Sequence, residues 1–184
     1  MSSFRIPLLA CAALLWLGPA HAAEQAAAPL QPVPALAVER YLGTWYEIAR
    51  YPNPFQRECI GHATATYALA AGGKLAITNR CSNRSGGTSE ADGVARQVGG
   101  AASARLQVRF APAWLGFLPF VWGDYWVIDL DPDYTLAAVS EPKRQYLWIL
   151  SRTPHVDSAR LQALVERLAA QGFDIDGLES TPQD

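Results

Sequence analysis

The feature that most constrains the fold of this chain is a series of short segments between residues 41 and 152 in which apolar and polar residues alternate. In the segment 104–110, every second residue is apolar, and Arg105, Gln107 and Arg109 fill the positions between. A period of two is that of a β-strand with one face toward a core and the other toward water. We therefore expect these three polar side chains to face the solvent.

Eight such segments, bounded by turn residues, are predicted as strands: 41–51, 62–69, 74–81, 90–98, 104–110, 123–131, 134–141 and 145–152. The Gly72-Gly73 pair between the second and third is typical of a hairpin turn. Short strands in unbroken succession predict an all-β chain that forms an eight-stranded antiparallel up-and-down β-barrel. Such a barrel encloses room for its own side chains or for one small ligand, and the strand count leaves both open.

The period changes after Pro154. Apolar residues in the segment 161–168 recur at intervals of three and four, which is typical of an amphipathic helix. Asp157 is a suitable N-cap and Gly172 a suitable stop. We expect one C-terminal α-helix that packs on the outside of the barrel.

The N-terminus has the features of an export signal. Residues 1–22 contain an apolar run shorter than the roughly 20 residues that cross a bilayer, followed by a small-x-small cleavage site that ends at Ala22. An alternative is lipid attachment at Cys11, which would make the protein a lipoprotein. Residues 23–38 are rich in Ala and Pro and are expected to form an extended tether, and residues 39–184 to form the domain. The expected location is the periplasm or the outer membrane.

Composition excludes some classes of protein. The chain has a formal net charge of −2 and is 50% hydrophobic and 17% charged. A nucleic-acid-binding domain usually carries a basic excess, and a disordered chain combines low hydrophobicity with high net charge. We therefore expect a folded domain that does not bind nucleic acid.

Cleavage after Ala22 would leave two cysteines, Cys59 and Cys81. In an exported protein, two thiols suggest one disulfide, although two unrelated buried cysteines are the alternative. Simple pairing across the glycine turn sets Cys81 opposite Thr64, so a β-bulge is needed to bring it to Cys59.

Three motifs in this order resemble the signatures of the lipocalin family. The first is centred on Gly43-x-Trp45, the second is the Asp-Pro-Asp-Tyr sequence that begins at Asp131, and the third ends at Arg152. The resemblance covers about residues 39–180, and the most similar group is the bacterial outer-membrane lipocalins, which are similar to apolipoprotein D. It supports the barrel and its external helix.

The motif residues are expected to form a closed barrel floor. Because strand direction alternates in an up-and-down barrel, Trp45, Asp131 and Arg152 converge on one end, next to Gly43. The Trp45 ring can close that end, and the Arg152 guanidinium can stack on its face. We expect this group to be structural rather than catalytic.

The resemblance implies a calyx that binds small hydrophobic ligands, without a cofactor or a metal. Family members place the positions of Asn79, Tyr125, Tyr146 and Trp148 toward the calyx, and if Arg152 points inward, strand alternation also directs Tyr146 and Trp148 inward. The full expected ligand site comprises Asn79, Val108, Phe110, Tyr125, Tyr146 and Trp148. The implied ligands are fatty acids or lysophospholipids, bound, stored or transported in the bacterial envelope in support of membrane maintenance. The alternative is that these rings fill the barrel as an ordinary core.

The expected mouth of the barrel is unusually apolar in the segment 111–122, which includes Trp114 and Phe117. Exposed apolar patches mark sites of binding or membrane contact. This loop is expected to dock on a membrane, on a second copy in a homodimer, or on the ligand's acyl chain, unless it folds back over the mouth. Lys143 and Arg144, on another mouth loop, are candidates to hold an anionic headgroup, with a solvated loop as the alternative.

An enzyme finds little support, because the chain has no Gly-x-Ser-x-Gly motif or phosphate-binding loop. The two histidines that follow the expected signal peptide, His62 and His155, have no partner at metal-ligand spacing. Two alternatives stay open: a calyx enzyme that uses Cys81 or Glu47, as in an isomerase, and an interaction module with a filled barrel.

Overall fold

The computed structural model describes residues 28–184. Its helices and strands, in chain order, are α1 (Val38–Tyr41), β1 (Gly43–Arg50), β2 (Cys59–Ala70), β3 (Lys74–Asn83), β4 (Thr88–Gln97), β5 (Arg105–Arg109), β6 (Gly123–Leu130), β7 (Leu136–Ser140), β8 (Leu147–Ser151), α2 (Ser158–Ala170) and β9 (Glu179–Ser180). The expected signal peptide at 1–22, with its alternatives of cleavage after Ala22 and lipid attachment at Cys11, lies outside the described residues. Within residues 28–184, no helix combines the length and apolar character needed to cross a membrane.

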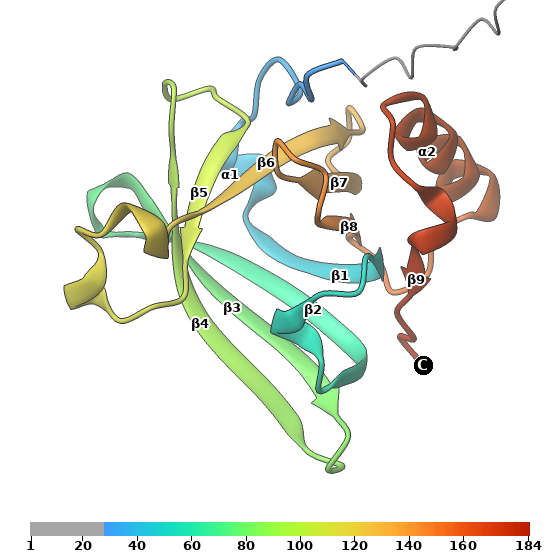
Figure 1. Ribbon diagram of the computed structural model, residues 1–184, viewed down its shortest axis with the longest axis horizontal. Helices are drawn as coiled ribbons and strands as arrows, with labels where there is room; N and C mark the ends of the chain where they lie inside the picture. Colours follow the sequence, from blue (N-terminus) through green and yellow to red (C-terminus); the bar gives the residue numbers. More distant parts are fainter. Residues whose placement is uncertain (1–27) are drawn as a thin grey trace, which may run out of the picture.

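Strands β1 to β8 form a closed barrel (Figure 1). Each pairs antiparallel with its successor, and β1 also pairs with β8, so that Tyr46 has both Thr64 and Ser151 as neighbours. The predicted antiparallel up-and-down barrel is therefore confirmed. Closure removes the exposed strand edges that an open sheet of this size would present.

The disulfide between Cys59 and Cys81 is confirmed, and it depends on irregular pairing in the β2–β3 hairpin. The register there differs by one residue from the expected one, because Thr64 lies opposite Arg80. Two bulges follow toward the mouth and bring Cys59 opposite Asn83. The Cα atoms of the two cysteines then lie 5.5 Å apart, within disulfide range.

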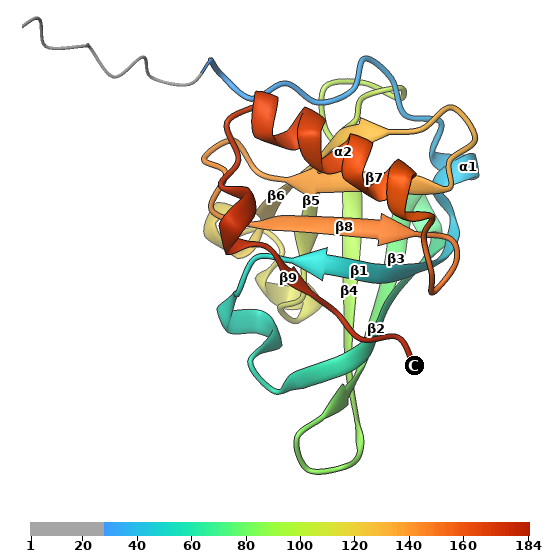
Figure 2. The ribbon, with the colours of Figure 1, turned by 90° about the vertical axis from the view of Figure 1, so that its right-hand side faces the viewer.

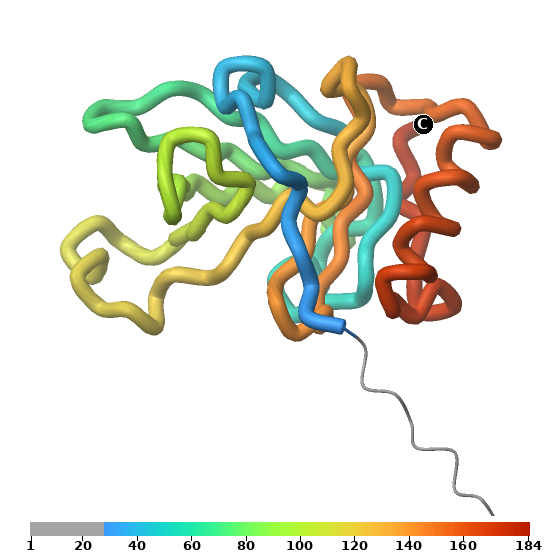
Figure 3. The backbone as a smooth tube through the Cα atoms, turned by 90° about the horizontal axis from the view of Figure 1, so that it is seen from above, coloured from blue at the N-terminus to red at the C-terminus, as the bar shows by residue number. Residues whose placement is uncertain are grey.

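Helix α2 packs on the outer wall of the barrel, as predicted (Figure 2). The Asp157 side chain accepts a hydrogen bond from the backbone N–H of Arg160, as an N-cap does. Leu164 and Leu168 are completely buried in a cluster that includes Ile149 of β8. This layer lies on the side of the barrel opposite the 111–122 loop (Figure 3).

The described part of the expected tether, residues 28–38, runs along the barrel instead of away from it. Leu30 and Leu36 are buried, and the backbone N–H of Val33 donates to the carbonyl of Val127 at 2.8 Å. Apolar side chains in the Ala/Pro-rich sequence thus have partners on the barrel. This stretch is part of the folded domain.

The C-terminal tail extends the sheet in a way that the sequence did not predict. Strand β9 pairs with the mouth-side half of β1, and the N–H of Thr181 donates to the carbonyl of Ile48 at 2.9 Å. Beyond it, the N–H of His62 in β2 donates to the carbonyl of Pro182 at 2.7 Å. The tail therefore fills the place between β1 and β2 where the bulges of β2 interrupt direct pairing (Figure 2).

Candidate functional site

The barrel interior is lined by one face of each strand, and β8 shows the alternation clearly. Leu150 and Trp148 belong to the interior cluster, whereas Leu147 and Ile149 belong to the cluster under α2. The predicted inward direction of Trp148 is therefore confirmed. The buried members of the interior cluster that come from the strands are Trp45, Tyr67, Leu75, Ile77, Ala95, Leu106, Val127, Ala137, Val139 and Leu150.

Several inward-facing side chains nearer the mouth of the barrel are only partly buried. Val108, Tyr125 and Trp148 pack against the interior cluster and still retain solvent-accessible surface. Asn79 is half-buried on the inward face of β3, and no residue of 28–184 donates a hydrogen bond to its buried Oδ1 atom. Solvent thus reaches the inner wall at the level of these four predicted site residues.

The two remaining predicted site residues lie at the rim. The Phe110 ring stands over Gly93 of β4, only 2.8 Å from where a Cβ atom would be, so only glycine fits there. Phe110 is 45% exposed and is a rim residue rather than a buried wall residue. The Tyr146 ring stacks on Trp148 at a centroid distance of 5.9 Å and also contacts Phe55 at 5.4 Å.

Three tyrosine hydroxyl groups meet inside the barrel, and two of these residues were not predicted. The Tyr125 hydroxyl lies 2.9 Å from that of Tyr41 and 2.8 Å from that of Tyr67. Burial raises the pKa of Tyr67 to about 12 and raises the pKa values of Tyr41 and Tyr125 well above their ordinary value. The group therefore stays neutral and places a few polar atoms in an otherwise apolar interior.

The sequence contained a signal for Tyr67 but not for Tyr41. Tyr67 shares the alternation of Ala63 and Ala65 on β2, which places it on the inward face. Tyr41 was assigned to the first strand, but it ends the short helix α1, from which its ring enters the barrel beside Trp45 at a centroid distance of 4.8 Å.

The barrel floor has the arrangement that the motifs predicted. The Arg152 guanidinium lies 3.9 Å from the centroid of the completely buried Trp45 ring, so the predicted stacking is confirmed. Arg152 also donates to the carbonyls of Arg40 at 2.8 Å and Thr44 at 3.0 Å. Gly43 has a φ of +90°, and a Cβ atom there would lie 3.3 Å from the guanidinium.

Asp131 organises the turn between β6 and β7 at the same end. Burial opposes its ionisation, but hydrogen bonds from Thr135 and Leu136 and the charge of Arg160 hold its pKa below the ordinary value. Arg160 of α2 pairs with it at 2.8 Å. Asp131 therefore anchors the turn and the helix to each other.

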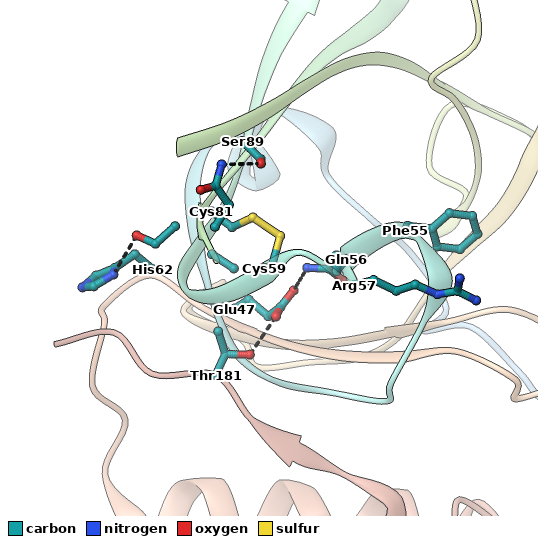
Figure 4. Close-up of a disulfide and its surroundings, with 12 residues drawn as sticks. Glu47, Phe55, Gln56, Arg57, Cys59, His62, Cys81, Ser89 and Thr181 are labelled. Carbon is teal, nitrogen blue, oxygen red and sulfur yellow. Dashed lines mark hydrogen bonds between the residues drawn. A yellow bond between two sulfur atoms is a disulfide. The ribbon is translucent and has the colours of Figure 1, made fainter. Parts of the chain in front are cut away.

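Glu47 is buried near the mouth side of β1 in a hydrogen-bonded group (Figure 4). Its carboxylate accepts from Arg50 at 2.6 Å, from Gln56 at 2.6 Å and from the Thr181 hydroxyl at 2.7 Å. Gln56 in turn accepts from the Trp148 indole at 2.9 Å. This group joins β1, the 51–58 loop and the C-terminal tail, and it gives Glu47 a structural role.

The calyx-enzyme alternative based on Cys81 is not supported, because its sulfur is bonded to Cys59 (Figure 4). A thiolate nucleophile needs a free thiol. The carboxylate of Glu47, the other candidate, is already engaged by three side-chain donors.

At the mouth, three rings of the 111–122 loop point to solvent. Trp114 is 73% exposed and Phe117 and Phe120 are each 79% exposed, so these rings do not fold back over the barrel. The loop does cover one residue that was expected to face water. Arg109 is only 8% exposed, because the loop folds over the outer face of β5 and brings Gly116 next to its guanidinium.

The two predicted mouth cations differ. Lys143 is exposed, as a headgroup ligand needs to be. Arg144 is turned toward α2, where it donates to the carbonyls of Gln171 at 2.9 Å and Ala28 at 2.6 Å. Arg144 thus connects the C-terminal end of α2 with residue 28, whereas Lys143 alone presents its charge to solvent.

Two grooves, of about 480 and 390 Å³, lie on the outside of the barrel. The larger one runs beside α2, and its charged lining is already paired, Asp131 with Arg160 and Asp129 with Arg167. These grooves therefore lie apart from the predicted ligand residues.

Comparison with known proteins agrees with this geometry. A family model described as a lipocalin-like domain matches residues 36–183. This chain belongs to the lipocalin family. Lipocalins as a family bind and carry small hydrophobic molecules, and the lipocalin described here has the barrel, the floor and the external helix.

Relatives of this lipocalin include bacterial and eukaryotic proteins. Temperature-induced lipocalin-1 of Arabidopsis thaliana is 40% identical over 156 residues, which cover 84% of this chain and 83% of the relative. Outer membrane lipoprotein Blc of Escherichia coli (strain K12) is 37% identical over 171 residues, 92% of each chain. Apolipoprotein D of Mus musculus is 29% identical over 153 residues, which cover 79% of this chain and 76% of the relative. The predicted resemblance to bacterial lipocalins and apolipoprotein D is confirmed.

The fold also matches solved structures. Insecticyanin from the tobacco hornworm Manduca sexta superimposes with a TM-score of 0.64 at 17% identity, over 85% of each chain. At this identity the likeness concerns the fold alone.

Proposed function

We propose that this lipocalin binds fatty acids or lysophospholipids and stores or transports them in a bacterial envelope, in support of membrane maintenance. The observation that carries the proposal is the inner wall, where Val108, Tyr125 and Trp148 face inward and remain partly accessible to solvent. Aromatic and aliphatic walls with few polar groups are typical of small-molecule sites. An acyl chain would lie among these side chains and Tyr146, below the ring of Phe110.

Burial of an acyl chain supplies enough free energy for such binding. Each methylene removed from water contributes about 0.8 kcal/mol, so ten would contribute roughly 8 kcal/mol before the cost of ordering the chain. The headgroup would remain at the mouth, near the exposed cations Lys143 and Arg57. No cofactor or metal takes part in this proposal.

Asn79 favours a ligand that carries a hydroxyl group. Its Oδ1 atom is buried, and no group of residues 28–184 donates to it, so a ligand hydroxyl placed there would gain a hydrogen bond. The small side chains of Ala65 and Ala91, which pair with Asn79 on the neighbouring strands, leave it without a protein partner. A lysophospholipid has a free glycerol hydroxyl that can donate to this oxygen, whereas an unsubstituted fatty acid has none along its chain.

The envelope location and the contacts with other surfaces are part of the same proposal. Outer membrane lipoprotein Blc, a relative named for that location, supports an envelope role. The exposed rings of Trp114 and Phe117 support contact of the 111–122 loop with a membrane, with homodimer formation as the second candidate.

The experiment is lipid extraction and mass spectrometry of the purified protein, with titration of delipidated protein by lysophosphatidylethanolamine and palmitate. We expect co-purified lipid, and in Asn79→Leu we expect a loss of affinity for the lysophospholipid that exceeds the loss for palmitate. Protein that carries no lipid and takes up neither ligand would contradict the carrier function. Equal losses for both ligands would contradict the role of Asn79 alone.

A further inference from the structure

Two arginines lie against one tryptophan at the base of the 111–122 loop. The guanidinium carbon of Arg96 on β4 lies 4.0 Å from the centroid of the Trp122 ring. The guanidinium carbon of Arg109 on β5 lies 5.3 Å from the same centroid. The Trp122 indole N–H donates to the carbonyl of Gly116 at 2.8 Å, which fixes the ring to the loop. Two cations from neighbouring strands and the base of the loop thus form one group.

Neither arginine has an ion-pair partner among residues 28–184. Arg96 donates to the neutral Oε1 of Gln107 at 2.8 Å. Arg109 donates through Nη1 to the carbonyls of Ala111 and Pro112, and its buried Nε has no hydrogen-bond partner in the described chain. A buried guanidinium without an anion is costly to the fold, so this group is chemically incomplete in the protein alone.

The acidic side chains of Asp92 and Asp124 lie on this face, and neither forms an ion pair with Arg96 or Arg109. Asp124 of β6 is exposed and accepts a hydrogen bond from Gln107 Nε2 at 3.5 Å. Gln107 therefore stands between this carboxylate and Arg96.

The loop above the two arginines is uncharged. From Phe110 to Gly123 the sequence contains no charged residue, and the Trp114, Phe117 and Phe120 rings point to solvent. The loop projects from the barrel beyond the ends of β5 and β6 (Figures 1 and 3). In a membrane, the apolar chains lie beneath a layer of anionic phosphates. The exposed rings of the projecting loop match the apolar layer, and the unpaired cations at its base match the phosphate layer.

We propose that the exposed Arg96, held against Trp122 and next to the buried charge of Arg109, binds the phosphate of an anionic phospholipid in a membrane, while the rings of the loop enter the apolar region. The planar guanidinium is suited to phosphate, and charge-assisted hydrogen bonds to phosphate are stronger than the one that Arg96 makes to the neutral amide of Gln107. This proposal depends on the membrane contact of the proposed function, and it adds a preference of that contact for anionic lipids. The phosphate site is separate from the ligand site, because Arg109 lies on the outer face of β5.

The test is co-sedimentation of the full protein with two kinds of vesicle, pure phosphatidylcholine and phosphatidylcholine with phosphatidylglycerol. We expect the anionic vesicles to bind more tightly, with a preference that falls as salt is raised. Arg96→Gln should reduce that preference about fivefold and leave binding to neutral vesicles unchanged. Trp114→Ser with Phe117→Ser should weaken binding to both vesicles.

Arg105→Gln is the matched control. Arg105 lies at the other end of β5, is exposed, and stacks on Trp126 at 4.8 Å, so the variant removes the same charge and the same kind of contact away from the loop. It should retain the anionic preference within about twofold. Arg109 is buried and donates to the loop carbonyls of Ala111 and Pro112, so the test uses the exposed Arg96, which makes no hydrogen bond to the loop.

The outcomes separate the two proposals. A loss in Arg105→Gln equal to that in Arg96→Gln, or wild-type protein without an anionic preference, would overturn the phosphate site and leave membrane contact standing. Wild-type protein that binds neither vesicle, or loop variants that change only the oligomeric state, would overturn the membrane contact as well. Ligand uptake in the barrel is measured separately and does not depend on either result.

Discussion

The Arg152 guanidinium lies 3.9 Å from the ring centroid of Trp45 and closes one end of the barrel. The contact joins the end of β8 to β1, and the same guanidinium donates to the carbonyls of Arg40 in α1 and of Tyr134 in the β6–β7 turn. One side chain thus connects three parts of the chain that are far apart in sequence.

Arg152→Met should lower the free energy of unfolding by about 2 kcal/mol, because it removes a cation–π contact and leaves carbonyls without their donor. Urea denaturation measures the loss. Arg160→Met is the control, because Arg160 lies at the same end but is 53% exposed in its pair with Asp131, and exposed pairs contribute about 0–1 kcal/mol. Equal losses in the two variants would contradict a special role for the stacked arginine.

Replacing Cys59 and Cys81 by serine should reduce the free energy of unfolding by about 3 kcal/mol. The bond closes a loop with a sequence separation of 22, and a cross-link of that length restricts the unfolded chain. Thermal and urea unfolding of the double variant measure the effect, with wild-type protein in reductant as the parallel sample. Unchanged midpoints in both would show that the bond does not stabilise the fold.

Glu47→Gln should lower the free energy of unfolding by about 3 kcal/mol, because it leaves the mostly buried Arg50 without its anion. Glu90→Gln is the control, since the Glu90–Arg80 pair is exposed and should contribute less than about 1 kcal/mol. Chemical denaturation of both variants provides the comparison. A stable Glu47→Gln protein would reopen a functional role for this carboxylate.

The tyrosine group predicts an alkaline loss of stability. The folded-state pKa of Tyr67 is raised to about 12 and its unfolded value is near 10, so its contribution is complete below pH 10 and is lost as the pH rises toward 12. Unfolding free energies measured from pH 8 to 12 should fall in that window, and ultraviolet titration should show late ionisation of buried phenols. In Tyr125→Phe, which removes the shared hydroxyl, we expect lower stability already at neutral pH. Ionisation of every phenol near pH 10 in the folded protein would contradict the buried group.

Alternation and motif order were sufficient to predict the barrel, its external helix and the Trp45–Arg152 contact, whereas the disulfide was predicted from the cysteine count. Each of the first three depends on local period or on the direction of consecutive strands, which a sequence records directly. The contacts of the Tyr41–Tyr67–Tyr125 group depend on barrel closure, and those of Thr181 on the bulges of β2, so neither follows from local pattern.

The loops explain the remaining differences. Arg109 has the sequence position of an outward, solvated residue, but the 111–122 loop folds over it. Arg144 belongs to a mouth turn, yet its side chain donates to the carbonyl of Gln171 at the end of α2 and to that of Ala28. A period of two assigns a face of the sheet and does not say which loop or helix covers that face.

The most direct test of a ligand-binding interior is titration with a fluorescent fatty acid of wild-type protein and two alanine-to-tryptophan variants on β2. Ala65 faces inward and is packed against the interior cluster, whereas Ala68 is exposed on the outer face of the same strand. We expect wild-type protein and Ala68→Trp to bind one ligand per chain and Ala65→Trp, whose indole would occupy the interior, to lose saturable binding. Binding by Ala65→Trp equal to that of wild type would show that the ligand lies outside the barrel, and its absence in all three proteins would indicate a filled barrel.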